Sequence, residues 1–586
     1  MGQPFESTLP EDEQYALGLI IDQIGNEKPE LLEAMRLCAV PHWFNNEILA
    51  WMRGEGIKPS EQTETIVEEL KSKKLAFVGP RDLFLHDNVR NLLLHRWRNE
   101  PENFRALNGK VAAYYEYKLQ QPASDEQCAE WEREEMYHSL VADPERGIDR
   151  FKGLCNKAID SYRLSTLDLL LSLASEQIGD LSAGIQCWIQ FFEGKKSQVL
   201  NDWEKALAIW EKLKQKRAAF TADLESALAI HLSILYKDRG EWTNAIECLN
   251  ESLKTLEGKA DRYGMIAILN NQGFLYKDKE DFQHAENDFQ RGLEVSKDVG
   301  DQRGMAVSLK NLGLLYKDSR KWDQALDRFK SSLSILETIG DELNVARGYD
   351  DRGLLYKDRG LLSGNKDDFQ KAENDFKNAL EIVERIGGEA EKAAAFNSLG
   401  LFYKDRGLRF KDNEDLQKAE NSFQSARELL EKIGDQRRIA DIFNYLGFLY
   451  TAALAWRDAD AHFERALTNF RNSLTILKEL GDERGTAVIL SNLGLLYQRK
   501  GEPQSAINYF QQSLEIVDKI GDEMNAATTM YELALVYDSM EHFGKAIELL
   551  EKVVKISEAV GHPDARIRKS REMLTMIKAK FNRRNL

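Results

Sequence analysis

The reactive side chains of this sequence show no arrangement typical of an enzyme. Its nine histidines are dispersed without the spacing of metal ligands, and neither Gly-x-Ser-x-Gly nor His-Glu-x-x-His occurs. The cysteines have no paired spacing, as expected for reduced thiols, and stand at Cys38, Cys128, Cys155, Cys187 and Cys248. We therefore predict a non-catalytic protein without a metal or cofactor.

A recurring set of charged, apolar and amide residues offers binding chemistry instead. Five lysines directly follow a tyrosine and directly precede an aspartate: Lys237, Lys277, Lys317, Lys357 and Lys404. An apolar residue stands two positions before each of eight tyrosines: Ile234, Phe274, Leu314, Leu354, Leu401, Phe448, Leu495 and Leu535. Asparagines precede the same tyrosines at Asn270, Asn397 and Asn444. The set predicts an apolar stripe that buries a peptide or helix face, with paired charges at its edge.

Both polar groups have a second interpretation. Lysines of one unit can pair with aspartates of the next and only join the units, since exposed ion pairs contribute about 0 to 1 kcal/mol each. The asparagines either hydrogen-bond the backbone of a ligand or are solvated polar positions. Both alternatives remain open from the sequence.

Helix pairs must position these residues. The tyrosines recur in steps of 40 or 47 residues, at Tyr236, Tyr276, Tyr316, Tyr356, Tyr403, Tyr450, Tyr497 and Tyr537. A small residue, usually glycine, stands three positions earlier, and an alanine and then a large apolar residue follow at helical spacing. Units close with Gly-Asp, which suits a left-handed helix cap and the start of the next helix. Each unit is therefore predicted to be two amphipathic helices.

This small-large pattern resembles the tetratricopeptide repeat, in the longer form of kinesin light chains and related adaptors. The resemblance covers residues 183–560, with eight clear units and a degenerate first one. It implies a right-handed α-α superhelix whose concave side is lined by the first helix of each pair. In the three 47-residue units, seven extra residues are expected to lengthen both helices by about one turn. Residues 561–586 are predicted to form a capping helix.

Residues 1–100 have a different pattern. Helices are predicted at 31–40, 45–54 and 61–74, two short strands at 75–79 and 83–85, and a further helix from Asp87. This order is typical of a winged helix. Its third helix carries Glu61, Glu64 and Glu68, which would meet DNA phosphates, so we favour a protein-facing domain over a DNA-binding transcription regulator.

The phrase around His86 and Asp87 resembles the histidine-aspartate motif that ends the winged helix of signal-transduction (STAND or NB-ARC type) ATPases. Residues 101–182 resemble their helical connector. The resemblance implies that His86 contacts bound ADP and that an ATPase or effector subunit is a partner. The alternative is an interior histidine bonded to neighbouring backbone. No Gly-x-x-x-x-Gly-Lys-Ser/Thr loop occurs, so the ATPase is either on another chain or lost.

The composition of the chain also indicates which partners and which location to expect. The net charge of -17 disfavours nucleic acid and anionic membranes. No apolar run reaches the length of a membrane span, and we expect a cytoplasmic protein. The sequence thus predicts a sensor or adaptor that binds a protein or peptide in its groove and signals through its winged-helix end. It names neither the partner nor the oligomeric state.

Overall fold

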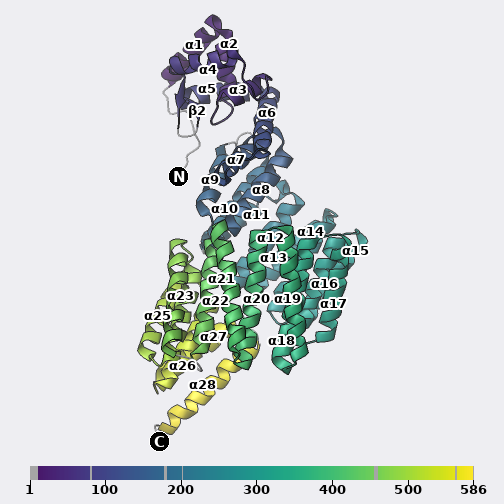
Figure 1. Ribbon diagram of the computed structural model, residues 1–586, viewed down its shortest axis with the longest axis vertical. Coiled ribbons are helices and arrows are strands. Elements are labelled where there is room, and N and C mark those ends of the chain that lie inside the picture. Colours follow the sequence, from purple (N-terminus) through teal and green to yellow (C-terminus); the bar gives the residue numbers. More distant parts are fainter. Residues whose placement is uncertain are drawn as a thin grey trace. The chain divides into compact units, whose positions relative to one another are not determined.

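The computed structural model describes residues 11–79, 82–176, 181–200, 202–454, 459–560 and 564–584. The chain divides into two compact units, Met1–Glu193 and Gly194–Leu586. Helices dominate both units, and the strands among the described residues form one two-stranded sheet (Figure 1). The predicted mainly α fold is confirmed.

The first unit begins with short helices and a hairpin and continues with longer helices. Its elements are α1 (Glu11–Glu27), α2 (Pro29–Cys38), α3 (Asn46–Arg53), α4 (Glu61–Ser72), β1 (Ala76–Val78), β2 (Leu83–Leu85), α5 (Asp87–Arg98), α6 (Pro101–Leu119), α7 (Asp125–Ala142), α8 (Pro144–Asp160), α9 (Leu164–Glu176) and the start of α10 (Ala183–Val199). The helix ends follow local rules. Asn45 and Ser60 accept hydrogen bonds from the backbone amides of Ile48 and Thr63, and Gly54 takes the left-handed conformation that ends α3.

The predicted order of three helices, a hairpin and a helix is present in α2 to α5. β1 and β2 pair antiparallel, with Phe77 opposite Phe84. Their inward side chains join a core of α2, α3, α4 and α5 that includes Leu85, Val67 and Leu93. The winged-helix classification and a boundary at residue 100 remain predictions.

The second unit is a row of antiparallel helix pairs, which stack side by side in Figure 1. Its helices are α11 (Trp203–Lys214), the 3-10 turn η1 (Arg217–Ala219), α12 (Ala222–Asp238), α13 (Trp242–Gly258), α14 (Arg262–Asp278), α15 (Phe282–Asp298), α16 (Gln302–Asp318), α17 (Trp322–Thr338), α18 (Glu342–Ser363), α19 (Lys366–Ile386), α20 (Glu389–Phe410), α21 (Asn413–Ile433), α22 (Gln436–Ala453), α23 (Ala459–Glu479), α24 (Glu483–Lys500), α25 (Pro503–Ile520), α26 (Glu523–Ser539), α27 (Phe543–Val560) and α28 (Asp564–Arg584). The tyrosines lie on the even-numbered helices α12 to α26, hereafter the first helices. Their odd-numbered partners are the second helices.

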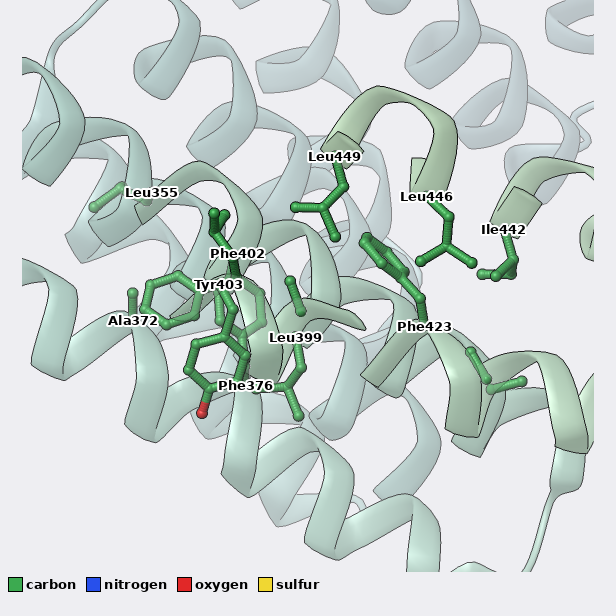
Figure 2. Packing of buried hydrophobic residues seen from close by; sticks show 14 of the residues in the cluster. Leu355, Ala372, Phe376, Leu399, Phe402, Tyr403, Phe423, Ile442, Leu446 and Leu449 are labelled. Atoms are coloured by element: carbon green, nitrogen blue, oxygen red, sulfur yellow. The ribbon is translucent and has the colours of Figure 1, made fainter. Parts of the chain in front are cut away.

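Glycine on the first helix lets each pair cross closely. A Cβ atom at Gly447 would lie 2.5 Å from a ring carbon of Phe470, and one at Gly400 would lie 2.6 Å from a ring carbon of Phe423. Both phenylalanines are fully buried. Only glycine leaves room for the ring of the second helix, as the spacing predicted. Figure 2 shows this core, with Phe376 and Phe402 packed beside Leu399.

The loops and the long units follow the predicted pattern. Asp301 and Asp482 accept hydrogen bonds from the backbone amides of Gly304 and Gly485 at helix starts, and the preceding Gly300 and Gly481 have φ near 70°. The helices α18 to α21 have 22, 21, 22 and 21 residues, against 17 in α14 to α17. In the first two long units the extra residues thus lengthen both helices by about one turn. In the third unit, among the described residues, α23 has 21 residues but α22 has 18.

The last helix closes the array. Ile577 of α28 is fully buried and belongs to a core cluster with Leu550 of α27 and Val536 of α26. The basic residues of α28 face outward in part, and Lys580 and Lys578 pair with Asp538 and Glu551. These contacts are those expected of a capping helix, and the capping role stays a prediction. Among the described residues, no helix is long and apolar enough to cross a membrane.

Candidate partner-binding face of the helical array

The first helices line the inner side of the array. Successive first helices pack against one another more closely than successive second helices do, which places them on the concave side. The predicted apolar stripe lies at the same position of each first helix, and all eight of its residues are half-buried. Five of them pack against the central core cluster: Phe274, Leu314, Leu354, Leu401 and Phe448. The structure therefore brings the stripe together as one partly exposed apolar row.

The lysine–aspartate pairs form a ladder from unit to unit. Four of the five lysine amino groups lie within 3.1 Å of an aspartate of the following unit, in the pairs Lys237–Asp278, Lys277–Asp318, Lys317–Asp358 and Lys357–Asp405. Burial alone would lower the pKa of Lys317, but Asp358 and Asp318 raise it. This is the geometry in which the pairs join the units.

The asparagine row forms a second ladder. The Asn270 side-chain oxygen accepts a hydrogen bond from Asn311 of the next first helix at 3.0 Å, and Asn444 accepts one from Asn492 at 2.9 Å. These two asparagines are bonded to the protein and are not solvated positions. The Asn397 side-chain oxygen is also buried but has no hydrogen-bond partner among the described residues.

Both ladders are interrupted between α20 and α22. Where the row would place an asparagine or serine to meet Asn397, α22 has Tyr445. Where it would place the next aspartate, α22 has Ala452, and among the described residues Lys404 pairs only with its neighbour Asp405, at 3.3 Å. Asn397 and Lys404 of α20 therefore lack, among the described residues, a partner on the next first helix such as the equivalent residues of other units have.

The ladders flank buried acids. Burial raises the pKa of Asp350 on α18 to about 6, against a hydrogen bond from Ser398 of α20 that lowers it. Burial also raises the pKa of Asp351, which the Lys310 charge of α16 opposes. The inner face therefore carries, beside its apolar row, two carboxyl groups whose pKa is raised above the ordinary value.

One contact joins units far apart in the sequence. Arg484 at the start of α24 lies 3.4 Å from Asp238 at the end of α12, and its guanidinium lies over the ring of Trp203 of α11. Arg484 also pairs with Asp522 at 2.8 Å. The start of α24 thus contacts the end of α12, six units earlier in the array.

The structure places His86 differently from the second of the two sequence interpretations. His86 is exposed, so it is not the interior histidine of the second interpretation, although it does bond to neighbouring backbone. It stands directly before α5 and its ring nitrogen accepts a hydrogen bond from the amide of Asn88 at 3.3 Å. This contact explains a helix cap. Nucleotide contact stays a prediction.

His42 and His138 are distant in the sequence but lie close together in the first unit. Their separation along the chain does not indicate this contact. His42 follows α2, whereas Glu134 and His138 are four residues apart on α7. One ligand atom of each of these three residues lies within 4.8 Å of those of the other two. The expectation of dispersed histidines is therefore wrong for this pair. The Glu-x-x-x-His spacing on one helix face was the detectable sign.

The comparisons with known proteins concern the second unit most clearly. The family model described as tetratricopeptide repeat matches residues 264–338, 466–519 and 485–559. These ranges lie in α14 to α17 and in α23 to α27. No curated protein matches the sequence.

Three solved structures are among those to which parts of this chain are similar. BtubC from P. vanneervenii is 19% identical, covering 42% of this chain and 94% of its own, with a TM-score of 0.34. A signal-transduction ATPase with a tetratricopeptide repeat sensor, from Pyrococcus horikoshii, is 13% identical, covering 83% and 68%, with a TM-score of 0.40. The quorum sensor NprR from B. thuringiensis is 14% identical, covering 63% and 97%, with a TM-score of 0.35. TM-scores this low carry no information on the function of this chain.

Proposed function

The chain contains tetratricopeptide repeats, and we propose that it is a non-catalytic sensor or adaptor whose inner face binds a protein or peptide segment. The observation that carries this proposal is the apolar row on the first helices. Its residues are half-buried and continuous over eight units, whereas most polar groups beside them already pair with the protein. The groups of this face that remain available to a ligand are therefore mainly apolar side chains.

An extended or helical segment fits this chemistry. Covering partly exposed leucine and phenylalanine side chains gains about 25 cal/mol for each Å² of apolar surface removed from water. The Lys-Asp ladder along one edge then orients polar flanks of the segment and disfavours partners with mismatched charges. This is the recognition mode in which an apolar face lies in a groove.

We place the centre of the site at the junction of α20 and α22. Within the described part of the chain the Asn397 oxygen is buried without a hydrogen-bond partner, and a buried unsatisfied acceptor costs about 1 to 3 kcal/mol. A backbone amide of a ligand would satisfy it. Lys404, free of a cross-unit aspartate, offers a cation on the same helix for a carboxylate of the segment. Leu401 and Phe448 supply the apolar floor.

We further propose that residues 1–182 pass the binding event to a protein partner, such as an ATPase or effector subunit, and not to DNA. Glu61, Glu64 and Glu68 lie exposed on α4, the helix that would enter the major groove. An acidic helix face repels phosphates. Salt-dependent binding of duplex DNA by the full chain would contradict this part of the proposal.

Selection from a displayed peptide library, followed by calorimetry, tests the groove. Leu401→Glu puts a charge into the row, and we expect it to weaken binding of a selected peptide by at least ~10-fold, since burying an unpaired charge is costly. The matched control is Leu362→Glu at the end of α18, where Leu362 is 57% exposed and outside the row. Equal binding by the Leu401→Glu variant, or loss only in the control variant, would reject the groove.

A further inference from the structure

The His42, Glu134 and His138 cluster of the first unit has a geometry that the helical array does not explain. The Nδ1 atom of His42 lies 3.0 Å from Oε2 of Glu134, and Nε2 of His138 lies 3.7 Å from the same oxygen. His138 is fully buried, and its Nε2 atom has no hydrogen-bond partner among the described residues. Such an atom requires an explanation.

Neighbouring residues fix the orientation of His138. The Asn108 side-chain nitrogen donates to the carbonyl oxygen of Phe104 at 2.9 Å, so its side-chain oxygen faces Nδ1 of His138 at 2.8 Å. Because this oxygen can only accept, Nδ1 must carry the proton. In the neutral ring, the lone pair of Nε2 then points at the Glu134 carboxylate, which is also an acceptor.

His42 is held in the same way from the other side. Its Nε2 atom lies 3.4 Å from Oε2 of Glu176 at the end of α9. When that nitrogen donates to Glu176, the lone pair of Nδ1 also points at Glu134. In that neutral tautomer of His42, three acceptors, two imidazole nitrogens and one carboxylate oxygen, converge on one point.

From this convergence we propose that His42, Glu134 and His138 bind a divalent transition metal ion, with Zn²⁺ the best match. Two imidazole nitrogens and one carboxylate are a known zinc ligand set, and atoms about 2.0 to 2.2 Å from a tetrahedral ion lie about 3.3 Å apart. The observed 3.0 and 3.7 Å bracket that spacing. Imidazole ligands favour zinc over calcium or magnesium.

The outer groups fit the same assignment. Metal-bound histidines generally donate their second ring nitrogen to a carboxylate or carbonyl oxygen, which sets the tautomer. Glu176 and Asn108 hold these positions for His42 and His138. We therefore assign Glu176 and Asn108 as positioning residues. The positive charge of Arg90 on α5 disfavours the protonated form of both histidines.

Bound metal would tie together three parts of the first unit. His42 belongs to the segment between α2 and α3, Glu134 and His138 belong to α7, and Glu176 ends α9. Binding to the folded state alone raises thermal stability. At saturating metal we expect the melting temperature of this unit to rise by ~5 °C or more.

The test uses the full chain without an oligohistidine tag, stripped by chelation and then loaded with Zn²⁺ or Co²⁺. We expect one tightly held equivalent by elemental analysis and the visible absorption of four-coordinate cobalt. The variants His42→Gln and Glu134→Gln, which keep side-chain size, should lose the equivalent while their far-ultraviolet circular dichroism stays unchanged. Glu176→Gln should weaken binding by about 10- to 100-fold without abolishing it.

The control is His95→Ala, an exposed histidine of α5 in the same unit, which should bind metal like the wild type. Absence of a bound ion in the wild type would overturn the proposal, and so would full binding by His42→Gln and Glu134→Gln. The cluster would then be a protonated His42 bridging Glu134 and Glu176. Equal loss in His95→Ala would show surface binding only and would also overturn it.

Discussion

Replacing Gly447 by alanine tests the close helix crossing on which the array is built. The added Cβ atom would lie 2.5, 2.6 and 2.7 Å from three ring carbons of Phe470, which is fully buried. Overpacking a core by one such group costs about 1 to 3 kcal/mol, and the rigid buried ring places this site in the upper part of that range. Alanine regains up to ~1 kcal/mol of helix propensity. We expect a net loss of about 1 to 2 kcal/mol.

The assay is urea unfolding combined with hydrogen exchange, because a repeat array can unfold in sections. Exchange should accelerate in α22 and α23 first. Gly258→Ala, in α13 of the same helical array, is the matched control, since a Cβ atom there meets nothing within 4 Å. It should be neutral or slightly stabilising.

A double-mutant cycle with Phe470→Leu separates the clash from other effects. If the ring is what Gly447 accommodates, the combined variant should be more stable than the sum of the single losses predicts, by more than ~1 kcal/mol. Wild-type stability of the Gly447→Ala variant would contradict a clash with the Phe470 ring. So would a loss of unfolding free energy in the combined variant that equals the sum of the two single losses.

Three further predictions follow from the polar contacts of the array. Burial raises the pKa of Asp288 in the folded protein to about 6, above its value in the unfolded chain. The free energy of unfolding therefore falls as the pH rises from about 4 to above 6, because the buried carboxyl group becomes charged. Asp288→Asn should therefore be more stable than the wild type by about 1 to 2 kcal/mol in urea unfolding at pH 7.5, with the gain gone at pH 4; a gain that is equal at both pH values would contradict this cause. Lys317→Met should cost less than ~1 kcal/mol, as expected for partly exposed pairs, and a loss above ~3 kcal/mol in the same assay would show that the ladder holds the array together. Arg484→Ala removes the contact between α24 and α12, so hydrogen exchange should increase at the end of α12 while α16 keeps wild-type rates; unchanged exchange at α12 would refute the closing role of this contact.

The repeat made most of the second unit predictable. Spacing indicated a small residue such as Gly447 on the first helix and a large apolar residue such as Phe470 on the second, but the contact between the two is seen only in the structure. It also located the apolar row, since one position in each first helix faces inward. The ends of individual helices followed from local caps such as Asp482.

Long-range pairing was not predictable from the same pattern. Whether Lys317 meets Asp358 or a ligand depends on how far one unit is rotated against the next, and the spacing within a unit does not contain that rotation. The contact of Arg484 with Asp238 spans six units and depends on the accumulated curvature. His42 meets His138 only because α2, α7 and α9 fold together, and a single histidine after a helix gives no sign of this.

The most direct test of the binding face is hydrogen exchange of the full chain with and without a peptide selected on it. We expect slower exchange in the first helices α18, α20 and α22, strongest near Asn397 and Leu401, with α19 and α21 little changed. Protection confined to the second helices, or to residues 82–176, would contradict the claim that the inner apolar row binds the partner.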